Sequence, residues 1–388
     1  MRLFRIAALP CFLLALPALL AAQASAELGG FVVTLGDDTL SAEQFVRTGS
    51  SLEVTRVARS PRVTVLTVRA ELGLDARITR FTSESRPGGM LERAASQASS
   101  VVFTDTSAQV TLRQGDSTRS YATAVSRHAL PMLAGTYALY DQATRHAVAA
   151  GQDSTPLQLV FPGAMNPLPS YVVRRGADSV TIGVFGFPAY ARVGPGGRLL
   201  GLDGRATTVK VDVARVDSLD IAALEKAWTL AEAERGMSGS LSPRDTAEAM
   251  IGSSTVTVDY GRPRKRGRTI FGGVVPLDEV WRTGANAATQ LMVASPVTIG
   301  GTIKLQPGVY TLWTLPAENG ATLIINGQTG QWGTEYHAER DVGRVPLAVS
   351  AGPEVEMFTI HVEERGDRRG AIIFAWDTTR WEAPFEVE

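Results

Sequence analysis

Apolar and polar side chains alternate along most of the first half of the chain. In residues 51–59 and 62–69, for example, nearly every second side chain is apolar. A period of two residues predicts β-strands with one apolar and one polar face, and residues such as Asp37 and Asp38 supply turns between them. The series ends at residues 209–213. It predicts an antiparallel sheet that is covered on one side only.

Two stretches of helical periodicity, residues 136–150 and 220–235, interrupt these strands and predict two helices. Asp217 or Ser218 can cap the second helix. Both helices are expected to cover an open sheet face. A long, curved antiparallel sheet with a helix in its concave side is similar in pattern to periplasmic lipoprotein carriers, which hold acyl chains there. The two stripes at helical spacing consist of Tyr137, Tyr140, Thr144 and Val148, and of Ile221, Leu224, Trp228 and Ala231.

The last third of the chain returns to a strand pattern after a break. Residues 236–240 are small and indicate a flexible linker. Ser242 and Pro243 form a helix cap and first turn, so residues 244–251 are predicted to be a short bridging helix. Strand-like runs between glycine and proline turns then predict a β-sandwich or jelly roll. These runs are residues 255–260, 309–313, 321–325, 357–362 and 371–376.

The first 26 residues have the features of a secretory signal peptide. Arg2 and Arg5 precede an apolar stretch at residues 7–22, and residues 24–26 read Ala-Ser-Ala, a cleavage signal. We therefore expect an exported protein, located in the periplasm or outside the cell after cleavage near Ala26. No later stretch approaches the roughly 20 apolar residues that a transmembrane segment needs.

Together these patterns predict a mainly β chain in four parts. The signal peptide occupies residues 1–26, and an antiparallel β domain with two helices occupies residues 27–235. A linker with a short helix, residues 236–253, joins it to a β-sandwich domain at residues 254–388. The first domain is expected to be a curved, helix-plugged sheet or a simpler open one, since alternation fixes the type of strand and not the curvature.

Composition limits the partners and the chemistry of the mature chain. Removal of the signal leaves 36 basic and 39 acidic side chains, which disfavours nucleic acid as the main partner. The basic run at residues 262–268 is accordingly interpreted as a solvated loop. The one cysteine, Cys11, lies in the predicted signal, so no disulfide or thiolate site is expected. Because 34 of the 38 basic residues are arginine, a single arginine is weak evidence of function.

The segment at residues 281–289 is the first candidate for a ligand-binding site. It joins Trp281, Arg282 and Asn286 around a glycine. Arginine offers a planar fork for carboxylate or phosphate, tryptophan offers a face for a sugar, an aromatic ring or a cation, and asparagine both donates and accepts. A structural role is the alternative. In that case Trp281 packs in the core, Arg282 pairs with a carboxylate and Asn286 caps a turn.

A second polar and aromatic segment, residues 331–337, carries Trp332, Tyr336 and His337 on a long loop, where binding residues often lie. On a helical turn, His337 and Asp341 could form a pair of metal ligands. The four histidines, His128, His146, His337 and His361, otherwise show no metal-ligand spacing, and we predict neither a metal nor a cofactor.

The last third contains several short motifs, among them VDYGRP at 258–263 and WRTGANAAT at 281–289. In their order and spacing these motifs resemble one family, the bacterial domain of unknown function 2911. Where the family pattern often reads Ala-Asn-Glu-Ala, this chain has Ala287 in place of the glutamate, so any chemistry of that acid in relatives would be absent here. The resemblance implies a domain type and no reaction. The motifs are VDYGRP at 258–263, GRTIFGG at 267–273, WRTGANAAT at 281–289, PGVYTL at 307–312 and QWG at 331–333.

The function predicted from these features is non-enzymatic binding by an exported envelope protein. The apolar concave sheet face would take a lipid-like or amphipathic ligand, and the polar and aromatic loops would take a glycan or an envelope-protein partner. One alternative is a cofactor-free hydrolase in which Arg282, Asn286, His337 and a distant carboxylate share a cleft. The other is a structural or assembly role, marked by an exposed apolar patch.

Overall fold

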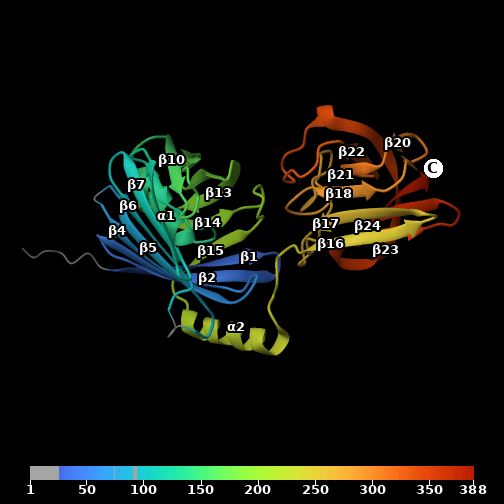
Figure 1. Ribbon diagram of the computed structural model, residues 1–388. Coiled ribbons are helices and arrows are strands. Elements are labelled where there is room, and N and C mark those ends of the chain that lie inside the picture. The colour runs from blue at the N-terminus through green and yellow to red at the C-terminus, as the bar shows by residue number, and fades with distance from the viewer. Residues whose placement is uncertain (1–25, 74, 91–93) are drawn as a thin grey trace, which may run out of the picture.

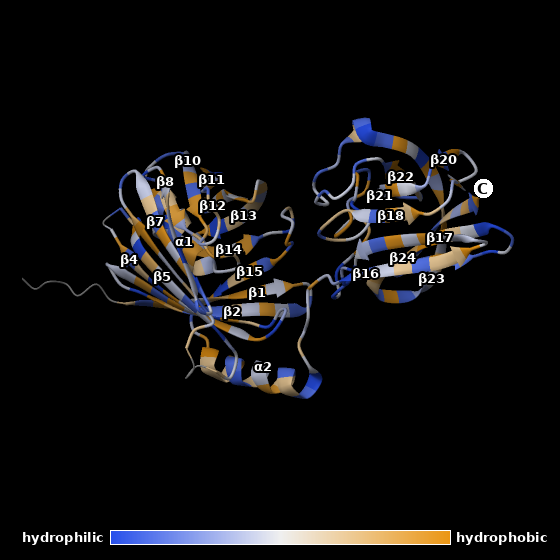
Figure 2. Ribbon diagram, viewed as in Figure 1, coloured by the Kyte–Doolittle hydropathy of each residue, from blue (hydrophilic) through white to orange (hydrophobic). Residues whose placement is uncertain are grey.

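The computed structural model describes residues 26–73, 75–90 and 94–388. The predicted signal peptide, apart from Ala26, lies outside the described residues. The described chain forms two large sheets and few helices, so the prediction of a mainly β protein is confirmed. Bands of hydrophobic and hydrophilic residues alternate along the strands (Figure 2), as the sequence pattern predicts.

The first sheet has 15 strands in the order β8-β7-β6-β5-β4-β3-β2-β1-β15-β14-β13-β12-β11-β10-β9. Neighbouring strands are antiparallel, except that β9 and β10 are parallel. The two edge strands do not pair with each other, so the sheet stays open. The strands are β1 (Glu27–Leu35), β2 (Asp38–Arg47), β3 (Ser51–Ala58), β4 (Thr64–Leu72), β5 (Ile78–Pro87), β6 (Gln97–Phe103), β7 (Ser107–Gln114), β8 (Ser117–Ala124), β9 (Ala129–Pro131), β10 (Ser154–Val160), β11 (Leu168–Arg174), β12 (Ser179–Val184), β13 (Phe187–Val193), β14 (Leu199–Asp203) and β15 (Asp212–Val216).

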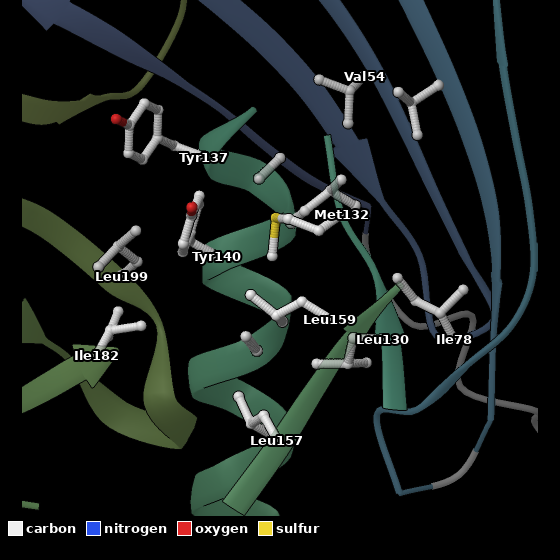
Figure 3. Packing of buried hydrophobic residues seen from close by; sticks show 14 of the residues in the cluster. Val54, Ile78, Leu130, Met132, Tyr137, Tyr140, Leu157, Leu159, Ile182 and Leu199 are labelled. Atoms are coloured by element: carbon white, nitrogen blue, oxygen red, sulfur yellow. The ribbon is translucent and has the colours of Figure 1, made fainter. Parts of the chain in front are cut away.

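The helix α1 (Tyr137–Ala149) is enclosed by this curved sheet (Figure 1). Ten of its 13 residues are buried, so the helix packs against neighbours on nearly every side. In Figure 3 the helix is flanked by Ile182 and Leu199 on one side and by Val54 and Ile78 on the other. Because α1 fills most of the concave face, the predicted helix-plugged sheet is confirmed and its apolar face is largely occupied. A short 3-10 helix, η1 (Pro195–Gly197), packs beside α1.

The helix α2 (Ile221–Arg235) lies on the opposite, outer face of the same sheet (Figure 1). Ile221 and Trp228 pack there against Val57, Val63 and Val65. The residue that caps this helix is Asp220, whose side chain accepts from the N–H of Ala223 at 2.9 Å. The prediction of Asp217 or Ser218 as the cap is wrong, because the helix begins at Ile221, too far along the chain for either residue to be the N-cap.

The second sheet has nine strands in the order β16-β17-β18-β21-β22-β23-β24-β19-β20. The long strands β23 and β24 allow this sheet to curve so that strands far apart in the strand order come into contact. The hydroxyl of Tyr260 on β17 accepts from the N–H of Ile360 on β23 at 2.9 Å, although these strands are not neighbours in the sheet. The elements are β16 (Arg244–Ile251), β17 (Ser254–Gly261), β18 (Thr289–Val293), β19 (Val297–Ile299), β20 (Ile303–Leu305), β21 (Gly308–Ala317), β22 (Gly320–Asn326), η2 (Ala338–Arg340), β23 (Asp341–Glu364) and β24 (Arg369–Val387).

Residues 244–251 form the strand β16, so the prediction of a short bridging helix there is wrong. Ala247, Ala249 and Ile251 alternate with the exposed side chains of Glu248 and Met250 and face the second core. A two-residue turn with Gly252 at φ 61° returns the chain into β17, and the two strands pair along their full length. Cross-strand pairing and core burial therefore override the Ser-Pro helix signal.

The start of α1 is anchored by a buried carboxyl group. Glu43 is fully buried, and its Oε1 accepts from the N–H of Ala138 at 2.5 Å. Burial raises the pKa of Glu43 to about 8, although the nearby charge of Arg56 opposes that shift. The folded protein therefore keeps this proton at pH values where the unfolded chain, with a pKa near 4.5, has released it.

We expect Glu43→Gln to flatten the pH dependence of stability. In the parent protein the free energy of unfolding falls as pH rises from about 5 to about 7, by on the order of 2 kcal/mol from this group. Glutamine keeps the acceptor for Ala138 and has no proton to lose. Urea titrations at several pH values check this, with Glu53→Gln on the exposed face as the control. Parallel pH profiles for Glu43→Gln and the parent protein would contradict it.

Candidate functional site

A cleft of about 630 Å³ lies between the two sheets. Its first wall consists of the loop 206–210 before β15, together with Leu35 and Phe187. Its second wall comes from two segments of the other sheet, residues 280–286 and 332–336. The volume is within the range of about 300–1,000 Å³ that is typical of small-molecule sites.

The two walls are held together by the turn between β1 and β2. The N–H of Asp37 donates to the carbonyl oxygen of Arg266 at 3.0 Å, and the guanidinium of Arg266 pairs with Asp38. Arg268 folds back and donates to the carbonyl oxygens of Lys265 and Arg264. The basic run 262–268 is therefore not a simply solvated loop, since it docks on the first sheet and lines the cleft.

The structure brings together five of the six residues proposed from sequence as ligand-binding. Trp281, Arg282, Asn286, Trp332 and Tyr336 all line the cleft. His337 is not among the lining residues. It is exposed, and its Nδ1 lies 3.1 Å from the Oε1 of Glu339.

Trp281 belongs mainly to the core of the second sheet. Only 8% of it is exposed, and its ring stacks at 6.0 Å on Trp376 and meets Phe358 edge-on at 5.2 Å. The backbone N–H of Trp281 donates to the carbonyl oxygen of Thr314, and the N–H of Thr314 donates to the carbonyl oxygen of Trp281. The structural role considered for Trp281 is thus observed, and a ligand in the cleft would touch only its margin.

The two polar segments are joined by backbone hydrogen bonds. The N–H of Ala288 donates to Gln331 at 3.2 Å, and the N–H of Gly333 donates to Asn286 at 2.9 Å. A side chain at Gly333 would collide with Arg282, because an added Cβ would lie 2.5 Å from the Cδ of Arg282. Glycine at this position therefore lets the arginine cross the loop and reach the cleft.

Arg282 is partly buried and has neither a hydrogen bond nor an ion pair with any residue that the structure describes. Burial alone lowers the pKa of its guanidinium. The predicted pairing with a carboxylate is not found in the described chain. A partly desolvated cation without a partner is costly, so Arg282 differs from the arginines that stabilise the fold.

Tyr336 and Trp332 form the aromatic part of the same wall. The Tyr336 hydroxyl donates to the carboxylate of Asp341 at 2.7 Å, its ring packs on Trp313 at 5.1 Å, and burial raises its pKa to about 12. Tyr336 is thus fixed and neutral. Trp332 is 47% exposed and presents a free ring face.

A second cavity, of about 370 Å³, opens at the end of the first sheet beside the start of α1. Its lining is mostly apolar and includes Tyr137, Tyr140 and Leu202. At its rim Phe185 and Val209 are each 46% exposed. Neither Phe185 nor Val209 was predicted from sequence as a site residue, and residues 209–211 precede β15 rather than belonging to it.

The cavity and the cleft are adjacent, since Thr207, Val209 and Leu241 line both. The apolar cavity thus continues into the polar and aromatic cleft. In the described residues there is no group of three or more histidine, cysteine, aspartate or glutamate side chains placed to hold a metal ion. Among the helices that the structure describes, none has the length and hydropathy to cross a membrane.

Residues 242–385 match the family described as Protein of unknown function (DUF2911), which confirms the resemblance found in the motifs of the last third. No curated protein gives a significant match to the chain.

Two solved structures are similar to part of the chain. One is a DUF1089 family protein from Pseudomonas aeruginosa, at 12% identity over 43% of this chain and 90% of that chain, with a TM-score of 0.31. The other is a beta-barrel-like protein of domain of unknown function DUF1849 from Brucella abortus, at 10% identity over 49% of this chain and 94% of that chain, with a TM-score of 0.32. At these TM-scores neither likeness bears on function.

Proposed function

We propose that this protein is an exported envelope protein that binds an amphipathic ligand without transforming it. The observation that carries the proposal is the apolar cavity of about 370 Å³ at the open end of the first sheet. Because α1 fills the rest of the concave face, this end is where an apolar group can enter. Export rests on the signal sequence at residues 1–26.

The cavity suits one apolar chain of modest length. Burial of apolar surface contributes about 25 cal/mol per Å², so a short alkyl chain gains several kcal/mol on entering it. The exposed side chains Phe185 and Val209 at the rim would also lose contact with water when a ligand covers them. Exposed apolar residues beside a concave apolar surface are typical of ligand entrances.

Titration with the neutral amphiphile monododecanoyl glycerol, below its critical micelle concentration, tests the proposal. We expect the protein to bind it, and Val209→Asp to weaken binding about tenfold or more, because the carboxylate would have to be desolvated at the rim. Val349→Asp is the matched control: Val349 is 48% exposed against 46% for Val209, and it lies on β23 outside both cavities.

Isothermal titration calorimetry supplies the affinities, and thermal melts verify that both variants fold. Equal binding by the two variants would place the amphiphile elsewhere. Absence of binding by the parent protein, together with a clean apo mass in native mass spectrometry of protein purified from the envelope, would refute the proposal.

A further inference from the structure

We infer that the cleft between the two sheets is an oxyanion site, and that Arg282 binds the phosphate or carboxylate head group of the ligand whose apolar chain enters the first sheet. The inference deepens the proposed function and rests on it for the apolar chain. The oxyanion site itself rests on separate observations.

The first observation is the charge of the cleft. Five basic residues line it against a single acidic one, Glu279, which is exposed. This excess is local, because the whole chain is close to neutral. A concave surface of one sign concentrates counter-ions and attracts ligands of the opposite charge. The basic residues are Lys210, Arg264, Arg266, Arg268 and Arg282.

The second observation is that most of this charge has no acidic partner in the described protein. Arg266 pairs with Asp38, whereas Arg268 and Lys210 donate only to backbone carbonyl oxygens and Arg282 donates to nothing described. Burial lowers the pKa of Lys210, and the positive charges of Arg282 and Arg268 lower it further, whereas Glu279 opposes this shift. Cations from both sheets therefore line one cleft and outnumber its single carboxylate.

The third observation is the position of these cations relative to the apolar cavity. Lys210 directly follows Val209, which lines both the cavity and the cleft. Lys210 also has φ 57°, a left-handed conformation that is uncommon for lysine, and Asn286 across the cleft has φ 64°, which asparagine adopts more readily. Such conformations collect at binding sites, where the surrounding structure enforces them.

An amphiphile with an oxyanion head group fits an apolar cavity that continues into a basic cleft. Its chain would occupy the apolar cavity, and its head would accept hydrogen bonds from the planar fork of Arg282, which suits phosphate and carboxylate. Trp332 would cover the head group from the open side. Because the cations come from both sheets, the ligand would bridge them.

Three probes separate the head group from the chain. Dodecyl phosphate carries both parts, monododecanoyl glycerol carries the chain with a neutral head, and inorganic phosphate carries the head alone. We expect the parent protein to prefer dodecyl phosphate to the neutral amphiphile by about tenfold, and this preference to shrink as salt screens it. Arg282→Gln should abolish the preference, because it removes the guanidinium that distinguishes a charged head group from a neutral one.

Arg340→Gln is the matched control, because Arg340 is an exposed arginine of η2, next to the second sheet, that lines neither cavity. Equal affinities for the two amphiphiles, or an equal loss in both arginine variants, would overturn the inference. Binding of inorganic phosphate that depends on Arg282, without binding of the neutral amphiphile, would support the oxyanion site while refuting the apolar part of the proposed function.

Discussion

Replacing Asp141 with alanine is expected to destabilise the first sheet by about 3–5 kcal/mol, because it leaves Glu27 as the one carboxylate near three closely packed, largely buried guanidinium groups in the described chain. Asp141 on α1 is fully buried. Its carboxylate accepts from Arg47 at 2.7 Å, from Arg145 at 2.9 Å and from the N–H of Leu199 at 2.7 Å. The same carboxylate lies 3.4 Å from Arg215. This side chain thus ties the plug helix to β2, β14 and β15.

Urea denaturation followed by circular dichroism measures the effect. Asp245→Ala serves as the control, since Asp245 forms an exposed pair with Arg262 at 2.7 Å and such pairs contribute about 1 kcal/mol or less. The prediction fails if the two aspartate variants lose similar amounts of stability. The chain contains two separate cores, so the transition of the first sheet should be assigned with a probe in α1.

Trp376→Ala is expected to lower the free energy of unfolding of the second sheet by about 3–5 kcal/mol, as is usual when a buried aromatic residue is removed. Trp376 is almost fully buried and packs between Trp281 and Phe358, at 6.0 and 5.8 Å. Trp281 and Phe358 cannot move in to fill the space, because backbone hydrogen bonds hold both of them in place.

Trp332→Ala gives the comparison for this prediction, because it removes the same type of side chain from an exposed position in the loop between β22 and β23. It should change thermal stability little, yet weaken binding of dodecyl phosphate. Thermal melts with fluorescence detection measure the first effect. If Trp332→Ala destabilises the sheet as much as Trp376→Ala does, then Trp332 is a packing residue and its place in the binding site is wrong.

Local patterns were sufficient to predict the mainly β chain and the helix at residues 137–149. Both depend on the spacing of apolar residues within a few turns or pleats, which the sequence contains directly. The same reasoning failed at residues 244–251. There Ala247, Ala249 and Ile251 alternate as in a strand, but the Ser-Pro pair before them favours a helix, and only pairing with β17 decides between the two.

The sequence allowed several residues of the candidate site to be predicted from their chemistry, but it did not show which residues come together to form the site. Arg282 and Trp332 were identified from their chemistry, and the structure places both on one wall of the cleft. Lys210 and Val209 were not identified, because they are about 70 positions from Arg282 in sequence and carry no motif of their own. They become site residues only because the turn at Asp37 docks the first sheet against Arg266.

The sequence by itself determined the strand pattern, the plug helix and the domain type of residues 242–385, because each is encoded in neighbouring residues. Only the tertiary structure decided that Trp281 is core, that Arg282 has no partner among the described residues and that an apolar cavity adjoins its cleft. Those properties depend on which side chains long-range contacts bring together. The sequence of an arginine and its neighbours does not show whether that arginine has an ion-pair partner in the fold. The charge of Arg282, which has no partner among the described residues, is therefore a property of the fold. It is the reason why we expect the ligand to be an anion.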